Sequence, residues 1–313
     1  TTVVDWYDAP LDDSHVDAAL QAHFDSGLRT VFALSGGQQA TLSSRLSRVV
    51  ERANDSTTTI AYGAVDFVDG ENWASARALG LRIHAHLGTS PDDAGTASIL
   101  SDRGRLGADV TLIHCTYLDD SDLAAIASSE TRVSICPSAE MAGGLGYPPI
   151  QRFVDHEMRL GLGVDDERLA PGDLFAQMRA VISIQHAAHF DRKLAGKSGL
   201  PSLMTTRDVL RYATVDGART AGLESMVGSI EVGKQADIIV LRGDRPNIWP
   251  INDAIGAVVW GMDTSNVDSV FVAGEPLVRE GACVADTSQA RQLAIAAQRH
   301  VGEAAKLFVG GQR

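Results

Sequence analysis

Short apolar runs, rich in β-branched residues, alternate with amphipathic stretches over about the first 190 residues. The apolar runs predict strands at 1–6, 29–34, 57–65, 81–87, 109–117, 132–138 and 160–166. Stretches with helical periodicity lie between them, at 12–27, 42–53, 71–80 and 119–129. Strands that alternate with helices predict a parallel sheet with helices outside it. The strands are apolar almost throughout, which is typical of parallel strands buried on both faces.

The number of predicted strands leaves two α/β architectures open. A closed (β/α)8 barrel needs eight strands, and this pattern contains seven. An open doubly wound sheet would fit the number, but nucleotide-binding members of that class carry a glycine fingerprint. The segment "FALSGGQQA" (32–40) has the wrong glycine spacing for a P-loop or a dinucleotide fingerprint. We therefore predict a TIM-type barrel that lacks its first strand.

The pattern changes after about residue 190. Residues 205–223 have helical periodicity, whereas 227–241 and 266–282 contain short strands separated by glycine turns. A last amphipathic helix is predicted over 287–308. We expect a hydrolase-type barrel over 1–222, a small β-sandwich module over 223–286, and a C-terminal helix within 287–313 that packs on the barrel.

Composition limits the classes of binding partner and the cellular compartment that we expect. The net charge of −13 argues against nucleic acid or an anionic membrane surface as a partner. No apolar run approaches the roughly 20 residues of a membrane span, and no signal peptide is evident. The three cysteines, Cys115, Cys136 and Cys283, are odd in number and scattered, so no disulfide framework is expected. A reducing, cytoplasmic location follows as the expectation.

Polar side chains gather where the predicted strands end. In parallel α/β folds, functional groups collect at the carboxyl ends of the strands. Those positions are held by Asp5, His84, His86, His114, Glu140, Asp165 and Asp166. Each histidine taken alone is more often a structural residue, but three of them beside several carboxylates suit a zinc- or iron-type ion. Cys136 has no obvious base beside it, so a thiol nucleophile is not expected.

Several longer segments resemble one known family. They are "LRIHAHLG" (81–88), "LIHCTYLDDSDLAAIA" (112–127), "VSICPSAEMAGGLGYPPIQRF" (133–153), "LGLGVDDERLAPGDLFAQMRA" (160–180) and "ATVDGARTAGLESMVGSIEVGKQADIIVL" (213–241). Together they are similar to the amidohydrolase superfamily, in its cytosine deaminase and triazine chlorohydrolase branch. The last segment resembles the family's return from barrel to β-sandwich. The resemblance covers nearly the whole chain.

The resemblance implies one divalent metal ion, with Zn²⁺ as the expected ion and Fe²⁺ as the alternative. In that family a His-x-His pair on the first strand, a histidine on the fifth and an aspartate on the eighth hold the ion. His86 and Asp165 match the last two, and His84 would support His86 from one pleat deeper. The first-strand pair would belong to a segment upstream of Thr1. A lysine-bridged pair of ions is not expected, because all four lysines follow the barrel strands.

The resemblance also implies a reaction. A metal-activated water would displace ammonia, an amine or chloride from an electron-poor carbon of an aminated or chlorinated N-heterocycle. Asp165 would move the proton, and His114 would hold the water and the substrate. Many deaminases of this branch carry a glutamate three residues after the fifth-strand histidine, where this chain has Thr89. Glu140 is the remaining candidate acid, and Asp5 and Thr89, with His84, are candidates for substrate contacts.

Two alternatives stay open at the level of sequence. The chain could belong to a mononuclear amidase acting on a cyclic or acyl amide. It could also be a catalytically incomplete remnant, if no first strand completes the site. Relatives of this kind are commonly oligomers, so a homo-oligomer is considered, but no interface is legible in the sequence.

Overall fold

The computed structural model describes residues 1–8, 12–35, 39–53, 57–65 and 70–310. Residues 36–38, within the glycine segment discussed above, lie outside the described residues. No helix in the described ranges is both long enough and apolar enough to cross a membrane.

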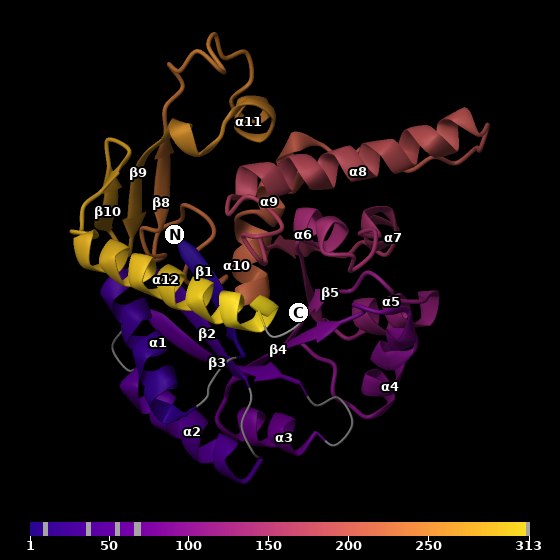
Figure 1. The fold of residues 1–313 in the computed structure, drawn as a ribbon. Helices are drawn as coiled ribbons and strands as arrows, with labels where there is room; N and C mark the ends of the chain where they lie inside the picture. Colours follow the sequence, from indigo (N-terminus) through magenta and orange to yellow (C-terminus); the bar gives the residue numbers. More distant parts are fainter. Residues whose placement is uncertain (9–11, 36–38, 54–56, 66–69, 311–313) are drawn as a thin grey trace.

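Seven parallel strands form one curled sheet (Figure 1), and their order in the sheet follows their order in the chain. The strands are β1 (Thr2–Tyr7), β2 (Arg29–Ser35), β3 (Thr58–Ala64), β4 (Arg82–Leu87), β5 (Val110–His114), β6 (Arg132–Ile135) and β7 (Leu160–Leu162). All seven predicted strands are confirmed. No ladder joins β7 to β1 within the described residues, so the sheet is a part-barrel with two edges, as expected for a TIM-type barrel without its first strand.

Helices cover the convex side of this sheet (Figure 1). Between the strands lie α1 (Asp13–Ser26), α2 (Gln39–Arg52), α3 (Glu71–Ala78), η1 (Pro91–Asp93), α4 (Thr96–Asp102), α5 (Asp120–Ser128), α6 (Pro137–Ala142) and α7 (Ile150–Asp155). After β7 follow α8 (Leu174–Leu194), α9 (Thr206–Tyr212) and α10 (Val215–Ala221). Aspartates begin several of them: Asp12 caps α1 and Asp119 caps α5 by accepting hydrogen bonds from free backbone N–H groups.

The two faces of the sheet bury different side chains. Large residues on one face, such as Phe32, Ile83 and Leu112, form the main core under the helices. The other face carries small residues on β2 and β3, which pack against the end of α10 and the residues that follow it. A side chain at Gly161 would come within 2.2 Å of Thr220, so β7 can lie against α10 only with glycine there. The small inner residues therefore let α10 enter the curl of the sheet.

A second, antiparallel sheet follows the barrel strands. It contains β8 (Ile238–Leu241), β9 (Val267–Val272), β10 (Glu275–Arg279) and β11 (Ala282–Cys283), in the order β11-β10-β9-β8. The short segments α11 (Ala254–Gly256), η2 (Ala257–Gly261) and η3 (Thr264–Asn266) lie between β8 and β9. The predicted β-rich module is thus present as a four-stranded sheet, while the boundaries proposed for the three parts of the chain stay predictions.

A buried ion pair ties the two sheets together. The Arg29 guanidinium, at the start of β2, donates to both carboxylate oxygens of Asp237, next to β8, at 2.7 and 2.8 Å. Their side chains are only 4% and 2% exposed. Two parallel N–H···O bonds of this kind fix direction as well as distance. The pair therefore fixes the position of the first residues of β8 relative to the start of β2.

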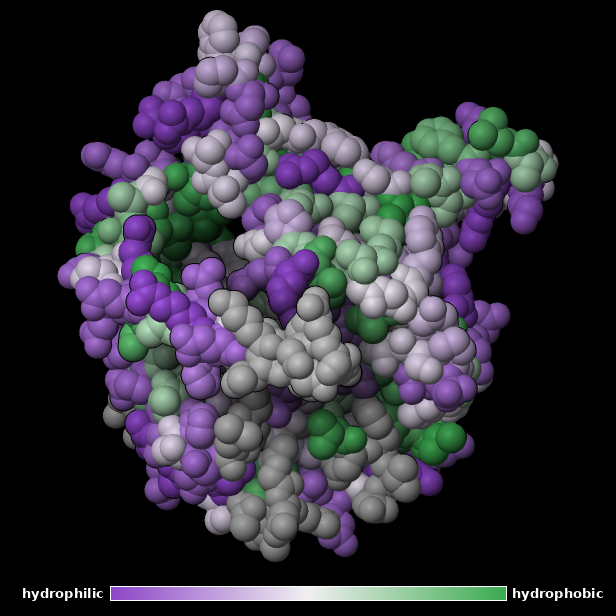
Figure 2. Space-filling model, viewed as in Figure 1, coloured by the Kyte–Doolittle hydropathy of each residue, from purple (hydrophilic) through white to green (hydrophobic). Residues whose placement is uncertain are grey.

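The last helix, α12 (Ser288–Gly310), forms where the sequence predicts it. Its side chains from Ser288 to Glu303 are all exposed, and Leu293, Ile295 and Val301 are 63%, 48% and 64% exposed. The predicted packing of this helix on the barrel is therefore not seen over these residues. In Figure 1 α12 runs next to the small antiparallel sheet. Figure 2 shows apolar residues among polar ones in the same region.

Candidate metal centre at the ends of β4 to β7

Two neighbouring strands bring His86 and His114 together. His86 lies near the end of β4 and His114 is the last residue of β5, and their rings stack with centroids 5.3 Å apart. Trp6 of β1 packs edge-on against His86 at 4.4 Å, and its Nε1 donates to the backbone oxygen of His84 at 3.1 Å. Trp6 thus fixes the β4 histidines from across the sheet. Sequence reasoning missed it, although its place next to Asp5 in an alternating strand puts the two on opposite faces.

The backbone bends sharply at this point. His114 and Cys115 have φ of 75° and 57°, a left-handed conformation that is uncommon for residues other than glycine. Gly88, at φ 72°, lies so close that an added Cβ would be 2.9 Å from the Cα of Cys115. Such conformations persist only where surrounding contacts enforce them, and they cluster at functional sites. Here Gly88 packs against Cys115 at the left-handed turn, and this turn sets the direction of the His114 side chain.

Glu140 holds the His114 ring from behind. Its Oε1 is 3.2 Å from His114 Nδ1 and also accepts a hydrogen bond from the backbone N–H of Cys136 at 2.7 Å. Both side chains are buried. Because a carboxylate only accepts hydrogen bonds, Nδ1 acts as the donor, which leaves His114 Nε2 for a ligand. A carboxylate behind a histidine is the usual outer support of a metal-binding imidazole.

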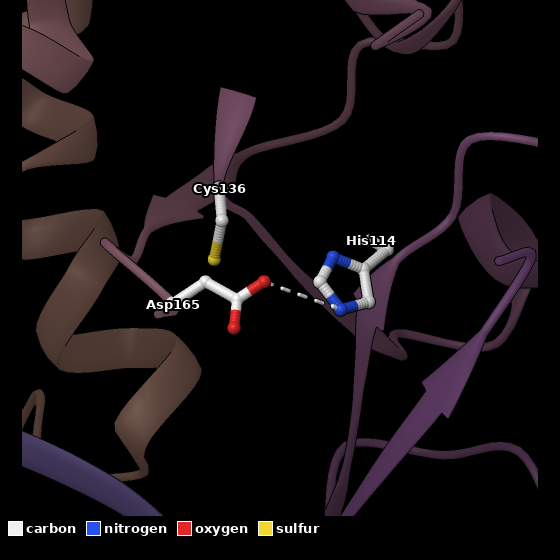
Figure 3. Close-up of side chains that lie close together, drawn as sticks. All are labelled: His114, Cys136 and Asp165. Atoms are coloured by element: carbon white, nitrogen blue, oxygen red, sulfur yellow. Dashed lines mark ion pairs between the residues drawn. The ribbon is translucent and has the colours of Figure 1, made fainter. Parts of the chain in front are cut away.

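Asp165 faces the free side of His114. It follows β7, has φ 59°, and places its Oδ2 4.0 Å from His114 Nε2 (Figure 3). Its side chain is 31% exposed, so the pair can be reached from solvent. The Sγ of Cys136 completes a group in which the three ligand atoms lie within 4.8 Å of one another. The site is therefore a partly exposed cluster of one imidazole, one thiol and one carboxylate at the rim that the carboxyl ends of β4 to β7 form.

The donor set fits a zinc ion. Zinc takes nitrogen, sulfur and oxygen ligands at about 2.0–2.3 Å. His86 offers a ring nitrogen and Asp165 an oxygen, and the Asp165 Oδ2 lies 4.0 Å from His114 Nε2, so an ion on Asp165 would lie beside His114. Burial, and then the nearby His114, lower the pKa of His86 to about 4, although Asp165 and Asp8 oppose the shift. His86 is then neutral near pH 7, which is the form that binds metal.

His84 lies one pleat below His86 and is 1% exposed. Neither ring nitrogen has a hydrogen-bond partner among the described residues. Burial, together with the charges of Arg82, Arg132 and His86, lowers the pKa of His84 to about 3, so the ring is neutral. His84 therefore lies beneath His86 as a neutral ring, and both its supporting role and its contact with a substrate stay predictions.

Two of the predicted site residues are not brought to the cluster. Asp5 pairs in register with Phe32, on the face that packs under the helices, and its Oδ2 lies 2.7 Å from His23 Nε2 on α1. Thr89 donates from its backbone N–H to Asp93 at 2.8 Å, within the cap of η1. Strand position placed Asp5 at the rim, and the family resemblance placed Thr89 there, whereas alternation and local capping turn their side chains elsewhere.

Comparison with known proteins supports the family that the sequence motifs indicate. A sequence profile described as the Amidohydrolase family matches residues 72–277. A 5-methylthioadenosine/S-adenosylhomocysteine deaminase of Moorella thermoacetica is 26% identical over 217 residues, which cover 66% of this chain and 49% of that protein. An S-triazine hydrolase of Gordonia rubripertincta is 28% identical over 168 residues, which cover 53% and 33%. The chain thus spans about half or less of the length of these curated relatives.

Solved structures agree on the fold. A zinc-bound adenosine deaminase from Xanthomonas campestris superposes with a TM-score of 0.81 at 19% identity, over 95% of this chain and 70% of that one. Atrazine chlorohydrolase from Arthrobacter aurescens TC1, complexed with zinc, gives a TM-score of 0.78 at 20% identity, over 94% and 71%. Both relatives bind zinc on a scaffold that this chain shares.

Proposed function

The chain belongs to the amidohydrolase family, and from that premise we propose that it carries the metal-binding rim of a hydrolase that displaces ammonia, an amine or chloride from a carbon of an N-heterocycle. The observation that carries the proposal is the meeting of His86, His114 and Asp165 at the carboxyl ends of β4, β5 and β7. The deaminase and triazine hydrolase relatives support the substrate class, because both are named for nitrogen heterocycles.

Each residue of the rim has a distinct part in this proposal. His86 and Asp165 would hold a divalent ion, zinc in the first instance. When bound, such an ion lowers the pKa of a water ligand toward neutrality. Asp165 takes the proton of the attacking water and delivers it to the leaving group. His114 Nε2 faces the same point and stabilises the negative charge that develops there. Glu140 keeps the His114 ring in that orientation, and Trp6 does the same for His86.

The test is an assay of the protein in the longest form that its gene encodes. Metal content is measured by elemental analysis. Ammonia and chloride release are then followed on methylthioadenosine, S-adenosylhomocysteine and amino- or chloro-substituted triazines. About one equivalent of zinc or iron, with release from a member of this panel, is the expected result. A protein that holds no metal and releases neither product would overturn the proposal. Turnover restricted to cyclic or acyl amides would replace it with the amidase alternative.

Glu140→Gln is expected to lower kcat by about 10- to 100-fold, the usual effect of losing a carboxylate that orients a site histidine, and to leave zinc affinity nearly unchanged, because His114 is not a metal ligand in this proposal. The amide keeps the size of the side chain but weakens its hold on His114 Nδ1, so KM should change little. Steady-state kinetics and zinc titration measure the two effects. Asp122→Asn is the matched control, because Asp122 is an equally buried carboxylate that caps backbone N–H groups of Gly95 and Ser98. Equal kinetics for the Glu140 variant and the wild type would rule out this positioning role.

A further inference from the structure

Cys136 belongs to the cluster at the strand ends but takes no part in the proposed reaction. It follows β6 directly and is buried. In Figure 3 its thiol points toward the Asp165 side chain, and its Sγ lies within 4.8 Å of a ligand atom on Asp165 and on His114. Cys115, the neighbour of His114 in sequence, instead packs in the main apolar core. Two buried cysteines on adjacent strand ends therefore have different surroundings.

Gly163, in the segment that follows β7, lies against the Cys136 sulfur. A Cβ at Gly163 would come within 2.8 Å of this Sγ, so glycine keeps the space around it open. The backbone N–H of Gly163 donates to the oxygen of Ile135 at 2.8 Å, which holds the two segments together at this point. The sulfur therefore borders the backbone that leads to Asp165.

We propose that Cys136 is a ligand of the metal ion that Asp165 holds, which gives the site a sulfur donor beside its imidazole and carboxylate donors. This inference rests on the proposed function, because it concerns the same ion. A site of nitrogen, sulfur and oxygen donors favours borderline-soft divalent cations such as Zn²⁺ over Mg²⁺ or Ca²⁺.

Metal binding at this sulfur involves a proton and no electrons. Burial, and then the charges of Glu140 and Asp165, raise the pKa of the Cys136 thiol well above its usual value, so the sulfur is protonated without a metal. Binding of the dication forms the metal–sulfur bond, breaks the S–H bond and releases one proton to solvent. The two carboxylates that oppose ionisation of the free thiol then offset the charge of the cation.

Cobalt substitution tests the inference directly. Co²⁺ added to the metal-free protein should give a thiolate-to-cobalt charge-transfer band in the near ultraviolet. The band should be lost in Cys136→Ser and kept in Cys115→Ser and Cys283→Ser, which alter the other two thiols. Cadmium-113 NMR of the unaltered protein checks the same bond without any substitution, since sulfur ligation shifts the resonance strongly downfield.

The outcomes separate this inference from the proposed function. Stoichiometric Co²⁺ binding without the band, or a band that survives in Cys136→Ser, overturns sulfur ligation, and the hydrolase proposal then stands or falls on its own assay. A band that depends on Cys136 supports the inference even if no heterocycle is hydrolysed. Failure to bind Co²⁺ or Cd²⁺ at all overturns the inference, and product release from the heterocycle panel still decides the function.

Discussion

Asp165→Asn is expected to lower kcat/KM by about 10²–10⁴-fold or more, the range for loss of a positioned acid–base group. An amide cannot accept the proton of the attacking water, and it is a weaker ligand than a carboxylate. The change keeps the size of the side chain and the φ of 59° that asparagine tolerates well. Kinetics on an active member of the heterocycle panel, together with elemental analysis, measure the loss of turnover and of metal.

The neighbouring aspartate provides the control. Asp166 is the next residue after Asp165, but its carboxylate pairs with the Arg168 guanidinium and is not part of the cluster around His114. Asp166→Asn should therefore leave both turnover and metal content near wild-type values. If the two variants lose activity equally, the assignment of Asp165 fails, because a general disturbance of the loop after β7 would then explain both results.

Arg29→Met is expected to reduce the free energy of unfolding by about 3–5 kcal/mol, the usual cost of removing one partner of a buried ion pair. The substitution leaves the Asp237 carboxylate without its guanidinium partner, at a point where both side chains are almost fully buried. Urea unfolding followed by circular dichroism measures the change. The loss should accompany weaker attachment of the small sheet to the barrel strands, visible as faster amide exchange in β8 and β9.

Two further variants make this prediction specific. Arg29→Met combined with Asp237→Leu replaces the pair with apolar groups and should recover much of the lost stability, because no buried charge remains. Arg242→Met breaks an exposed pair with Asp244 and should leave the unfolding curve unchanged. An Arg29 variant as stable as the wild type would show that the pair does not hold the two sheets together.

The same pair gives stability a dependence on acid pH. Burial of Asp237 opposes its ionisation. The hydrogen bond from Arg29, the N–H of Ala273 and the Arg29 charge outweigh burial and lower its pKa below 3.8. Because the folded pKa is depressed, the stabilisation is fully present above the unfolded carboxyl range and is lost as pH falls through the folded pKa. Urea midpoints across that acid range should fall more steeply for the wild type than for the double variant.

The sequence predicted most secondary structure because local patterns decide it. All seven apolar runs form strands. The first four stretches with helical periodicity form helices, and aspartates cap two of them, α1 and α5. Parallel pairing followed from the alternation of strand and helix. The C-terminal helix also formed, but its packing was not predictable, since a helical pattern does not state which surface the helix covers.

For the site, the sequence by itself determined which residues stand at the strand ends, since His86, His114 and Asp165 follow from strand boundaries and motif resemblance. Only the tertiary structure decided which of the rim side chains meet. It turned Asp5 toward His23, brought Trp6 onto His86, set Glu140 behind His114 and aimed Cys136 at Asp165. The physical reason is that strand register, left-handed backbone turns and close glycine approaches depend on contacts between distant segments, which no local pattern of residues contains.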